Sequence, residues 1–151
     1  MSLGDELSPF LLLVHHKHSF TPFDPFRTIT NLITPEGFPA HAHAGFSTVT
    51  ITIPDQGSNG LVHRDSEGNA GVYNDGDVQY MKAGRGTIHE EMWEVDSKKH
   101  TNIELYQLWI NSPQRNKFDQ PRCSIISKES IKAASMHRNG VHMQVIDGNI
   151  V

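Results

Sequence analysis

The sequence has only one cysteine, Cys123, among its 151 residues. A single cysteine cannot form an intrachain disulfide, so we predict a reducing compartment: the cytoplasm, and also the nucleus if the source is eukaryotic. Long apolar runs are lacking too. The longest near the N-terminus, Phe10 to Val14, is far shorter than the ~20 residues of a membrane-spanning helix and too short for the core of a secretory signal. These absences argue against a membrane protein and an ordinary secreted protein.

An excess of positive charge is also missing. Thirteen lysines and arginines stand against 17 aspartates and glutamates, which gives a net charge of −4. Proteins that bind nucleic acids generally carry a basic face, so we expect no direct contact with nucleic acid. The length suits one domain. Histidine is abundant, with ten residues, and any bound metal would therefore be held by imidazole and carboxylate groups.

The distribution of turn residues predicts an all-β fold. From Gly37 to about Asn111, short strands alternate with turns that contain glycine, which is typical of a β-sandwich or barrel. Ile103 to Asn111 is apolar on both faces and is expected to be a buried central strand. One short helix is predicted near the C-terminus, from Lys128 to Ser135, with Ser127 as its N-cap.

The clearest alternation of side chains runs from His41 to Ile53. Its even positions are mostly threonine, and its odd positions carry two histidines followed by Val49 and Ile51. Because successive side chains of a strand point to opposite faces, we expect the odd face to enter the core and to present both imidazoles at one end. A β-bulge at Gly45 would shift the register between the two halves.

A second pair with the same spacing, His89 and Glu91, follows a glycine-containing turn. Together with His41 and His43 it offers three imidazoles and one carboxylate, a ligand set that suits divalent first-row metals. An octahedral ion would keep two positions for water, dioxygen or a chelating substrate. Fe(II) fits this chemistry best, and Mn, Ni, Cu and Zn remain alternatives. A closed structural zinc site is less favoured, since such sites rely on cysteine. The competing interpretation is that the H-x-H and H-x-E pairs are ordinary strand residues that bind no metal.

Other reactive or aromatic side chains are more simply structural. His63 is expected to stabilise a turn or lie on the surface, and Cys123 to be a small, partly buried residue. An N-terminal strand or loop is expected to contain His15, His16 and His18. Core or pocket-lining roles are expected for Phe46, Trp93 and Trp109.

Four stretches and one short motif resemble the pirin family of the cupin superfamily, over roughly residues 24 to 122. They are D-P-F (24–26), G-F-P-A-H-A-H-A-G-F-S-T-V-T (37–50), H-R-D-S-E-G-N-A-G-V (63–72), G-D-V-Q-Y-M-K-A-G-R-G-T-I-H-E-E-M (76–92) and L-W-I-N-S-P (108–113). The resemblance implies a cupin β-barrel, a jelly-roll, with one metal ion, usually iron. The family's ligands fall on His41, His43, His89 and Glu91.

The sequence departs from the family pattern H-P-H-R-G-F-E-T at three positions. Ala42 replaces the proline, Ala44 the arginine and Ser47 the glutamate, and Tyr80 stands where tryptophan is common. The expected ligands are kept, whereas the charges of positions 44 and 47 are lost. Preference for a substrate or partner is therefore expected to differ from that of other members.

Pirins resemble a pair of cupin domains, about twice this length. We therefore expect residues 1–125 to form a pirin-type N-terminal cupin domain, and residues 126–151 to be a linker and the first strand of a truncated or missing C-terminal cupin domain. The apolar segment 141–151 would leave an exposed strand edge. A partner subunit in a homodimer or the first domain would cover this edge; otherwise the segment would be disordered.

The resemblance implies two functions of different classes. One is oxygenation of a small aromatic substrate such as a flavonol, as in a quercetin 2,3-dioxygenase, with Glu91 as candidate base for the hydroxyl proton. The other is a non-catalytic, redox-responsive module that binds a protein partner, such as a transcription co-regulator. A metal-binding cupin remnant without activity is the third interpretation.

Overall fold

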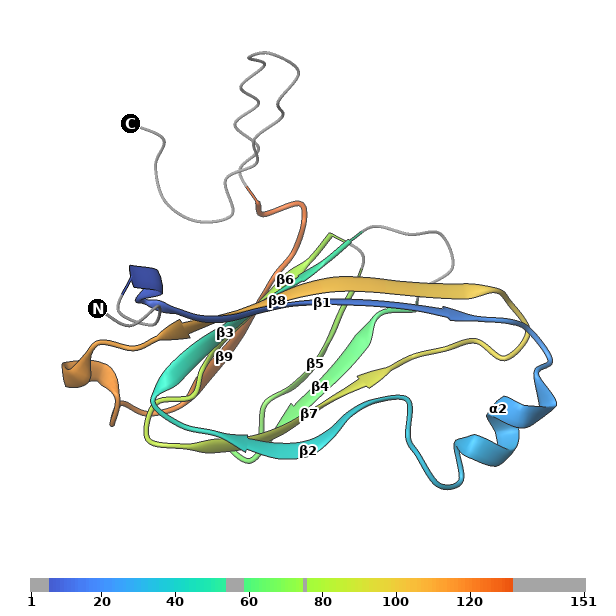
Figure 1. Cartoon of the computed structure of the whole chain (residues 1–151), viewed down its shortest axis with the longest axis horizontal. Coiled ribbons are helices and arrows are strands. Elements are labelled where there is room, and N and C mark those ends of the chain that lie inside the picture. Colours follow the sequence, from blue (N-terminus) through green and yellow to red (C-terminus); the bar gives the residue numbers. More distant parts are fainter. Residues whose placement is uncertain (1–5, 54–58, 75, 132–151) are drawn as a thin grey trace, which may run out of the picture.

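Two antiparallel β-sheets lie face to face in this computed structural model, which describes residues 6–53, 59–74 and 76–131 (Figure 1). One sheet has the order β1 (Phe10–Phe20), β8 (Thr101–Asn111), β3 (Phe46–Thr52), β6 (Val78–Lys82) and β9 (Arg122–Ile126). The other has the order β2 (Gly37–His43), β7 (Thr87–Trp93), β4 (Leu61–Asp65) and β5 (Ala70–Tyr73). The all-β prediction is confirmed. β8 lies between β1 and β3 inside its sheet, but the expectation that it is buried on both faces is wrong, since Tyr106 is exposed.

Short helical elements accompany the strands. Helix α2 (Pro25–Thr30) begins after Asp24, whose side chain accepts a 2.9 Å hydrogen bond from the backbone N–H of Phe26. Proline at the first helical position and aspartate at the N-cap are favourable there. The sequence analysis missed this helix because one and a half turns are too short to show a helical period. The 3-10 element η1 spans Gln114–Asn116.

The predicted C-terminal helix lies only partly within the described residues. Its first residues form a turn, in which the backbone N–H of Ser130 donates to the carbonyl oxygen of Ser127 at 2.9 Å. A hydrogen bond ties this turn to the rest of the fold: the backbone N–H of Lys128 donates to Oδ1 of Asp77 at 2.9 Å. The remainder of that helix, the strand expected at 141–151 and the rest of the expected second-domain segment beyond residue 131 fall outside the described residues.

The segment from His41 to Ile53 is two strands in two different sheets, and not the single strand that alternation suggested. The chain leaves β2 at His43 and enters β3 at Phe46. Gly45, between them, has a φ of +77° and donates its N–H to the carbonyl oxygen of Gly84 at 2.8 Å. A left-handed conformation of this kind suits glycine. Gly45 thus marks the point where the register changes, as the sequence analysis anticipated.

Because the chain crosses from one sheet to the other, the buried face of β3 is the opposite of the face that was expected. Thr48, Thr50 and Thr52 are buried, whereas Val49 and Ile51 are only half-buried. The expectation that the apolar face enters the core is therefore wrong for β3, because one residue of offset turns every side chain of a strand to the other face. The hydroxyl of Thr52 donates to the carbonyl oxygen of Asp77 at 2.9 Å, which accommodates it in the interior.

The interior has an apolar part and a polar part. Leu61, Tyr73, Ile103 and Leu105 form the buried apolar cluster. The rest is mostly polar: among the described residues, eight hydrophobic and thirteen polar or charged residues are buried. Burying polar groups costs free energy unless they are paired, and several of them are paired with each other, as Tyr73 is with Glu91. No helix within the described part of the chain combines the length and apolar character needed to cross a membrane.

Candidate metal centre

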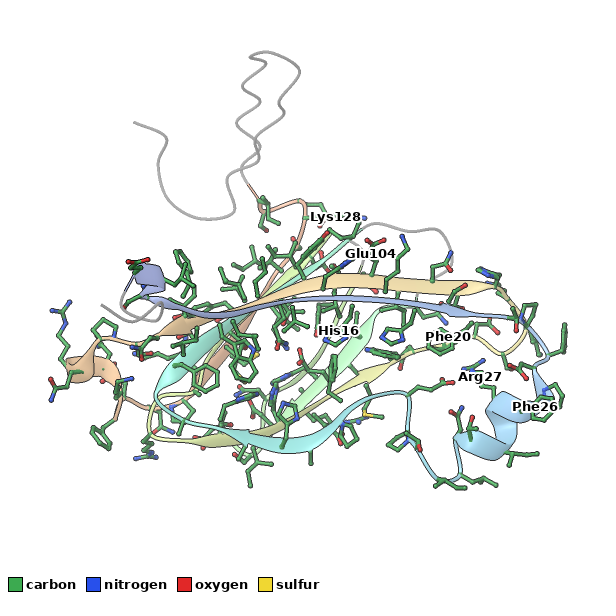
Figure 2. The ribbon with its side chains drawn as sticks, in the orientation of Figure 1. His16, Phe20, Phe26, Arg27, Glu104 and Lys128 are labelled. Atoms are coloured by element: carbon green, nitrogen blue, oxygen red, sulfur yellow. The ribbon has the colours of Figure 1, made fainter. Side chains whose placement is uncertain are left out.

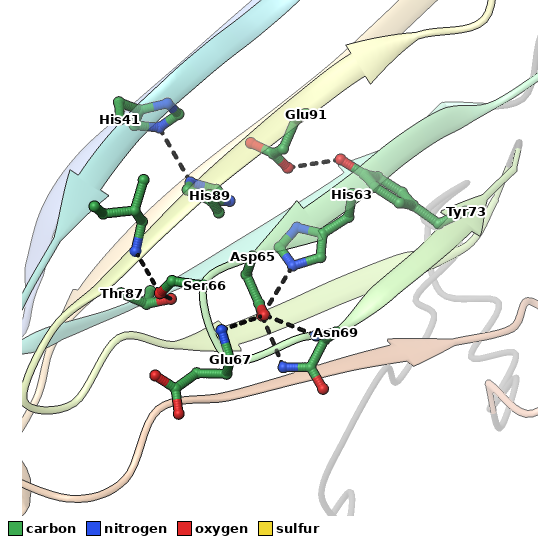
Figure 3. A network of polar contacts seen from close by, with 11 residues as sticks. His41, His63, Asp65, Ser66, Glu67, Asn69, Tyr73, Thr87, His89 and Glu91 are labelled. Atoms are coloured by element: carbon green, nitrogen blue, oxygen red, sulfur yellow. Dashed lines mark hydrogen bonds and ion pairs between the residues drawn. The ribbon is translucent and has the colours of Figure 1, made fainter.

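Strand pairing brings His41, His43 and His89 together between the two sheets; Figure 3 shows His41 and His89 of this group. In the β2–β7 ladder His41 lies directly opposite His89, and His43 lies opposite Thr87. Directly opposed residues have Cβ atoms about 5 Å apart, and a residue two positions along points to the same face. One ring nitrogen from each of the three histidines lies within 4.8 Å of the other two. We call these three residues the imidazole cluster.

Two of the ring nitrogens are spaced as ligands of one metal ion would be. Nε2 of His41 is 3.1 Å from Nε2 of His89. With metal–nitrogen bonds of about 2.1 Å, neighbouring ligand atoms are about 3.0 Å apart at octahedral angles and about 3.4 Å apart at tetrahedral angles. Nδ1 of His41 donates to the carbonyl oxygen of Pro39 at 2.7 Å. A carbonyl only accepts, so the lone pair of His41 is on Nε2 and faces the cluster.

The environment keeps the cluster in the form that binds metals. Burial, together with the adjacent imidazoles, lowers the pKa of His89 to about 3. Burial and the neighbouring His41 lower the pKa of His43 to about 4. Both rings are therefore neutral near pH 7, and only a neutral imidazole offers a lone pair. Imidazole ligands suit iron, nickel, copper and zinc, so a set of three histidines fits a divalent metal ion.

Glu91 lies two residues from His89 on β7, but its carboxylate does not join the imidazole cluster. It is 1% exposed and is held by three other side chains. The Tyr73 hydroxyl donates to Oε1 at 2.6 Å, and Nε2 of Gln107 donates to Oε2 at 3.1 Å. The Thr50 hydroxyl lies 3.5 Å from Oε1. The structure thus places Glu91 beside the three histidines, with its oxygens turned toward these donors.

The residues that hold Glu91 were not identified from the sequence. Gln107 is a polar residue within an otherwise largely apolar strand, and Thr50 belongs to the threonine face of β3. A polar side chain amid apolar neighbours was the available signal for Gln107. The side chain of Gln107 also accepts a 2.7 Å hydrogen bond from Nε1 of Trp109. Tyr73 carried no local signal, because its role depends on strands that are distant in sequence.

Aromatic side chains border the cluster on one side, as expected for pocket-lining residues. His43 packs edge-on against Phe46 and Trp109, with ring centroids 4.9 and 5.1 Å away. His43 also lines a cavity of about 420 Å³ whose wall includes Ala42 and Ala44. These two small residues stand where the pirin pattern has proline and arginine. The proline and arginine of the pirin pattern are therefore replaced by alanine on a surface next to His43.

Two further departures from the pattern contact each other. The hydroxyl groups of Ser47 and Tyr80 are 3.2 Å apart, within hydrogen-bond distance. Ser47 is buried on β3 and Tyr80 is partly exposed on the adjacent strand β6. The serine and tyrosine that replace the pattern's glutamate and tryptophan therefore form a pair of their own.

The structure also shows the positions of the histidines for which only structural roles were expected. His15, His16 and His18 lie on strand β1, as expected. His16 and Phe20 point from this strand toward the opposite sheet (Figure 2), where His16 packs on Phe38 at 4.9 Å. His63 is 1% exposed, so the expectation that it could lie on the surface is wrong. Its Nε2 contacts Oδ2 of Asp65, and the other carboxylate oxygen of Asp65 accepts from the backbone N–H of Asn69 in the following turn.

The sequence profile of the pirin family matches residues 2–110. The chain belongs to the pirin family. It is 38% identical to Pirin-1 of Arabidopsis thaliana over 143 residues, which cover 95% of this chain and 41% of that protein. The predicted family and the cupin fold class are thereby confirmed.

Solved structures agree with this assignment. A quercetin 2,3-dioxygenase from Acinetobacter baumannii is 36% identical, with a TM-score of 0.77; the match covers 98% of this chain and 48% of that one. The bacterial pirin YhhW of Escherichia coli, in complex with nickel(II), is 26% identical with a TM-score of 0.51; the match covers 81% of this chain and 44% of that one. This chain spans about half the length of these relatives or somewhat less.

Proposed function

We propose that this pirin is a mononuclear metal protein that oxygenates a flavonol, in the manner of a quercetin 2,3-dioxygenase. The observation that carries the proposal is the imidazole cluster, with two ring nitrogens 3.1 Å apart. The likeness to the Acinetobacter baumannii quercetin 2,3-dioxygenase supports the substrate class. His41, His43 and His89 would hold the metal, with Fe(II) as the proposed ion, and Glu91 is the candidate fourth ligand.

Each side chain of the proposed site has a distinct task. A bound metal ion would supply Lewis acidity and a template for dioxygen and a chelating substrate. Pro39 fixes the ring of His41 through its carbonyl oxygen, which sets the lone pair toward the ion. Phe46 and Trp109 offer an aromatic wall beside His43 for a planar substrate. Glu91 is the candidate base that accepts the substrate's hydroxyl proton.

Oxygen consumption tests the proposal. Protein loaded with Fe(II) without air is mixed with quercetin and air-saturated buffer, and oxygen uptake is followed. We expect uptake that requires both iron and quercetin, and that His89→Ala abolishes through loss of iron. Glu91→Gln removes the base and should slow uptake by about 10²–10⁴-fold.

His100→Ala is the matched control, because this histidine is exposed and bonds to Ser19 away from the cluster. It should bind iron and consume oxygen as the unmodified protein does. If folded, fully iron-loaded protein takes up no oxygen with quercetin, the dioxygenase proposal fails for this substrate. Iron retained by His89→Ala would contradict the assignment of the ligands.

A further inference from the structure

Three more metal-binding side chains meet outside the imidazole cluster. His63 and Asp65 lie two residues apart on β4, and Cys123 comes from β9 of the opposite sheet. One ligand atom from each lies within 4.8 Å of the other two. The packing of the two sheets brings Cys123 to the other two residues, so the spacing in the sequence gave no sign of its contribution.

The spacing of the first two ligand atoms suits a tetrahedral ion. Nε2 of His63 is 3.2 Å from Oδ2 of Asp65, and both side chains are almost fully buried. Ligand atoms around a tetrahedral zinc ion are about 3.4 Å apart, given bonds of about 2.1 Å. An ion could therefore replace the hydrogen bond between them with small movements of both groups (Figure 3).

Backbone groups hold Asp65 in the orientation that such a site needs. Its Oδ1 accepts hydrogen bonds from the N–H groups of Glu67 and Asn69, at 3.0 and 2.9 Å. Its Oδ2 faces His63 and also accepts from Nδ2 of Asn69 at 2.8 Å. One oxygen is thus fixed by the turn and the other is directed at the histidine. Contacts of this kind orient metal ligands in known sites.

Open space adjoins His63 and Cys123, two of the three side chains. A cavity of about 370 Å³ is bordered by His63, Cys123, Gly71 and Ile125, among others. Gly71 is the cross-strand partner of His63, and Ile125 packs closely against this glycine. A Cβ at this position would lie 2.6 Å from Cδ1 of Ile125. The cavity would give an ion a path of entry. It would also have room for a water molecule as the fourth ligand of the ion.

We propose that His63, Asp65 and Cys123 form a second metal site, for a borderline-soft divalent cation such as Zn²⁺. A neutral imidazole, a carboxylate and a thiolate carry a total charge of −2, which balances the dication in the interior. Binding breaks the S–H bond of Cys123, forms the metal–sulfur bond and releases one proton to solvent. Thiolate favours zinc over the harder ions that oxygen ligands select. This site does not depend on the function proposed for the imidazole cluster.

Cobalt(II) is the probe that separates the two sites. A cobalt–thiolate bond gives a charge-transfer band in the near ultraviolet, and Cys123 is the single cysteine of the chain. We expect metal-free protein to develop this band when Co²⁺ is added, and Zn²⁺ to abolish it. His43→Ala, which alters only the imidazole cluster, should keep the band. Cys123→Ser should lose it and should bind about one equivalent of Zn²⁺ less than the unmodified protein.

Ser124→Ala, a substitution at the next position of β9, is the matched control and should keep the band. His63→Gln leaves the thiol in place and should weaken cobalt binding at this site at least tenfold, because loss of a residue that only orients a ligand already costs about 10–100-fold in metal affinity. The proposal is overturned if folded, unmodified protein shows no thiolate band with Co²⁺. It is equally overturned if Cys123→Ser binds as much Zn²⁺ as the unmodified protein does.

Discussion

The hydroxyl of Tyr73 donates a 2.6 Å hydrogen bond to Oε1 of Glu91, and both side chains are at most 1% exposed. Gln107 donates to the other carboxylate oxygen from the opposite sheet. The carboxylate beside the imidazole cluster is thus held from both sheets at once. Its position depends on the whole barrel being assembled, and not on β7 alone.

Tyr73→Phe removes this hydrogen bond and little else. A hydrogen bond to a charged group contributes about 1.5–3 kcal/mol, so we expect the free energy of unfolding to fall by about that amount. Urea unfolding measures the loss. Tyr106→Phe, on the exposed face of β8, should change stability by less than about 0.5 kcal/mol. Equal effects of the two substitutions would show that the buried contact contributes nothing.

Two glycines with positive φ should differ in their tolerance of alanine. Gly45 has a φ of +77°, and a Cβ there meets only Lys117 at 3.6 Å or more. Gly45→Ala should therefore cost only the backbone strain, about 1–2 kcal/mol. A Cβ on Gly84, with a φ of +51°, would lie 2.1 Å from the carbonyl oxygen of Asp119. Gly84→Ala should cost clearly more by urea unfolding, and equal losses would contradict the described packing of this turn.

The stability contributed by Lys82 should depend on pH. The hydrogen bond from Lys82, helped by one from Asn116, holds the pKa of the Asp119 carboxyl below its usual range. A carboxyl whose pKa is lower in the folded state stabilises the protein above its unfolded pKa, and this stability disappears as the pH falls through the folded pKa. Lys82→Gln should thus destabilise the protein at pH 7 and much less near pH 3. Thermal unfolding at both values tests this.

The exposed Lys98 supplies the comparison for that experiment. Lys98→Gln should leave the unfolding temperature unchanged at both pH values. If the unfolding temperature of Lys82→Gln differs from that of the unmodified protein by the same amount at pH 7 and at pH 3, the proposed link to Asp119 is ruled out.

The sequence predicted the fold class well because strand and turn signals are local. Glycine-containing turns marked most strand ends between Gly37 and Asn111, and spacing of two residues placed His41 with His43 and His89 with Glu91 on common faces. The buried face of β3 was predicted incorrectly. Alternation reports that two faces differ, but which face is buried depends on where the chain changes sheets, and here that occurs at Gly45.

What the sequence could not predict are side-chain contacts between strands that are not adjacent, whether within one sheet or between the two sheets. Tyr73 reaches Glu91 from β5 and Gln107 reaches it from β8, across sequence separations of 18 and 16 residues. Cys123 meets His63 from the opposite sheet in the same way. Such contacts depend on strand order and register together, neither of which is set by a local pattern. The short helix α2 was missed for another reason, since its six residues are too few to show a period.

The most direct test of the central claim is the amount of Fe(II) that the imidazole cluster binds. The measurement uses Cys123→Ser, which removes the thiolate of the second site, beside the double variant Cys123→Ser/His89→Ala. Metal-free protein of each kind is equilibrated with Fe(II) without air, and bound iron is determined per chain. The account predicts about one equivalent for the single variant and none for the double variant. No iron in the folded single variant, or as much in the double variant, would contradict it.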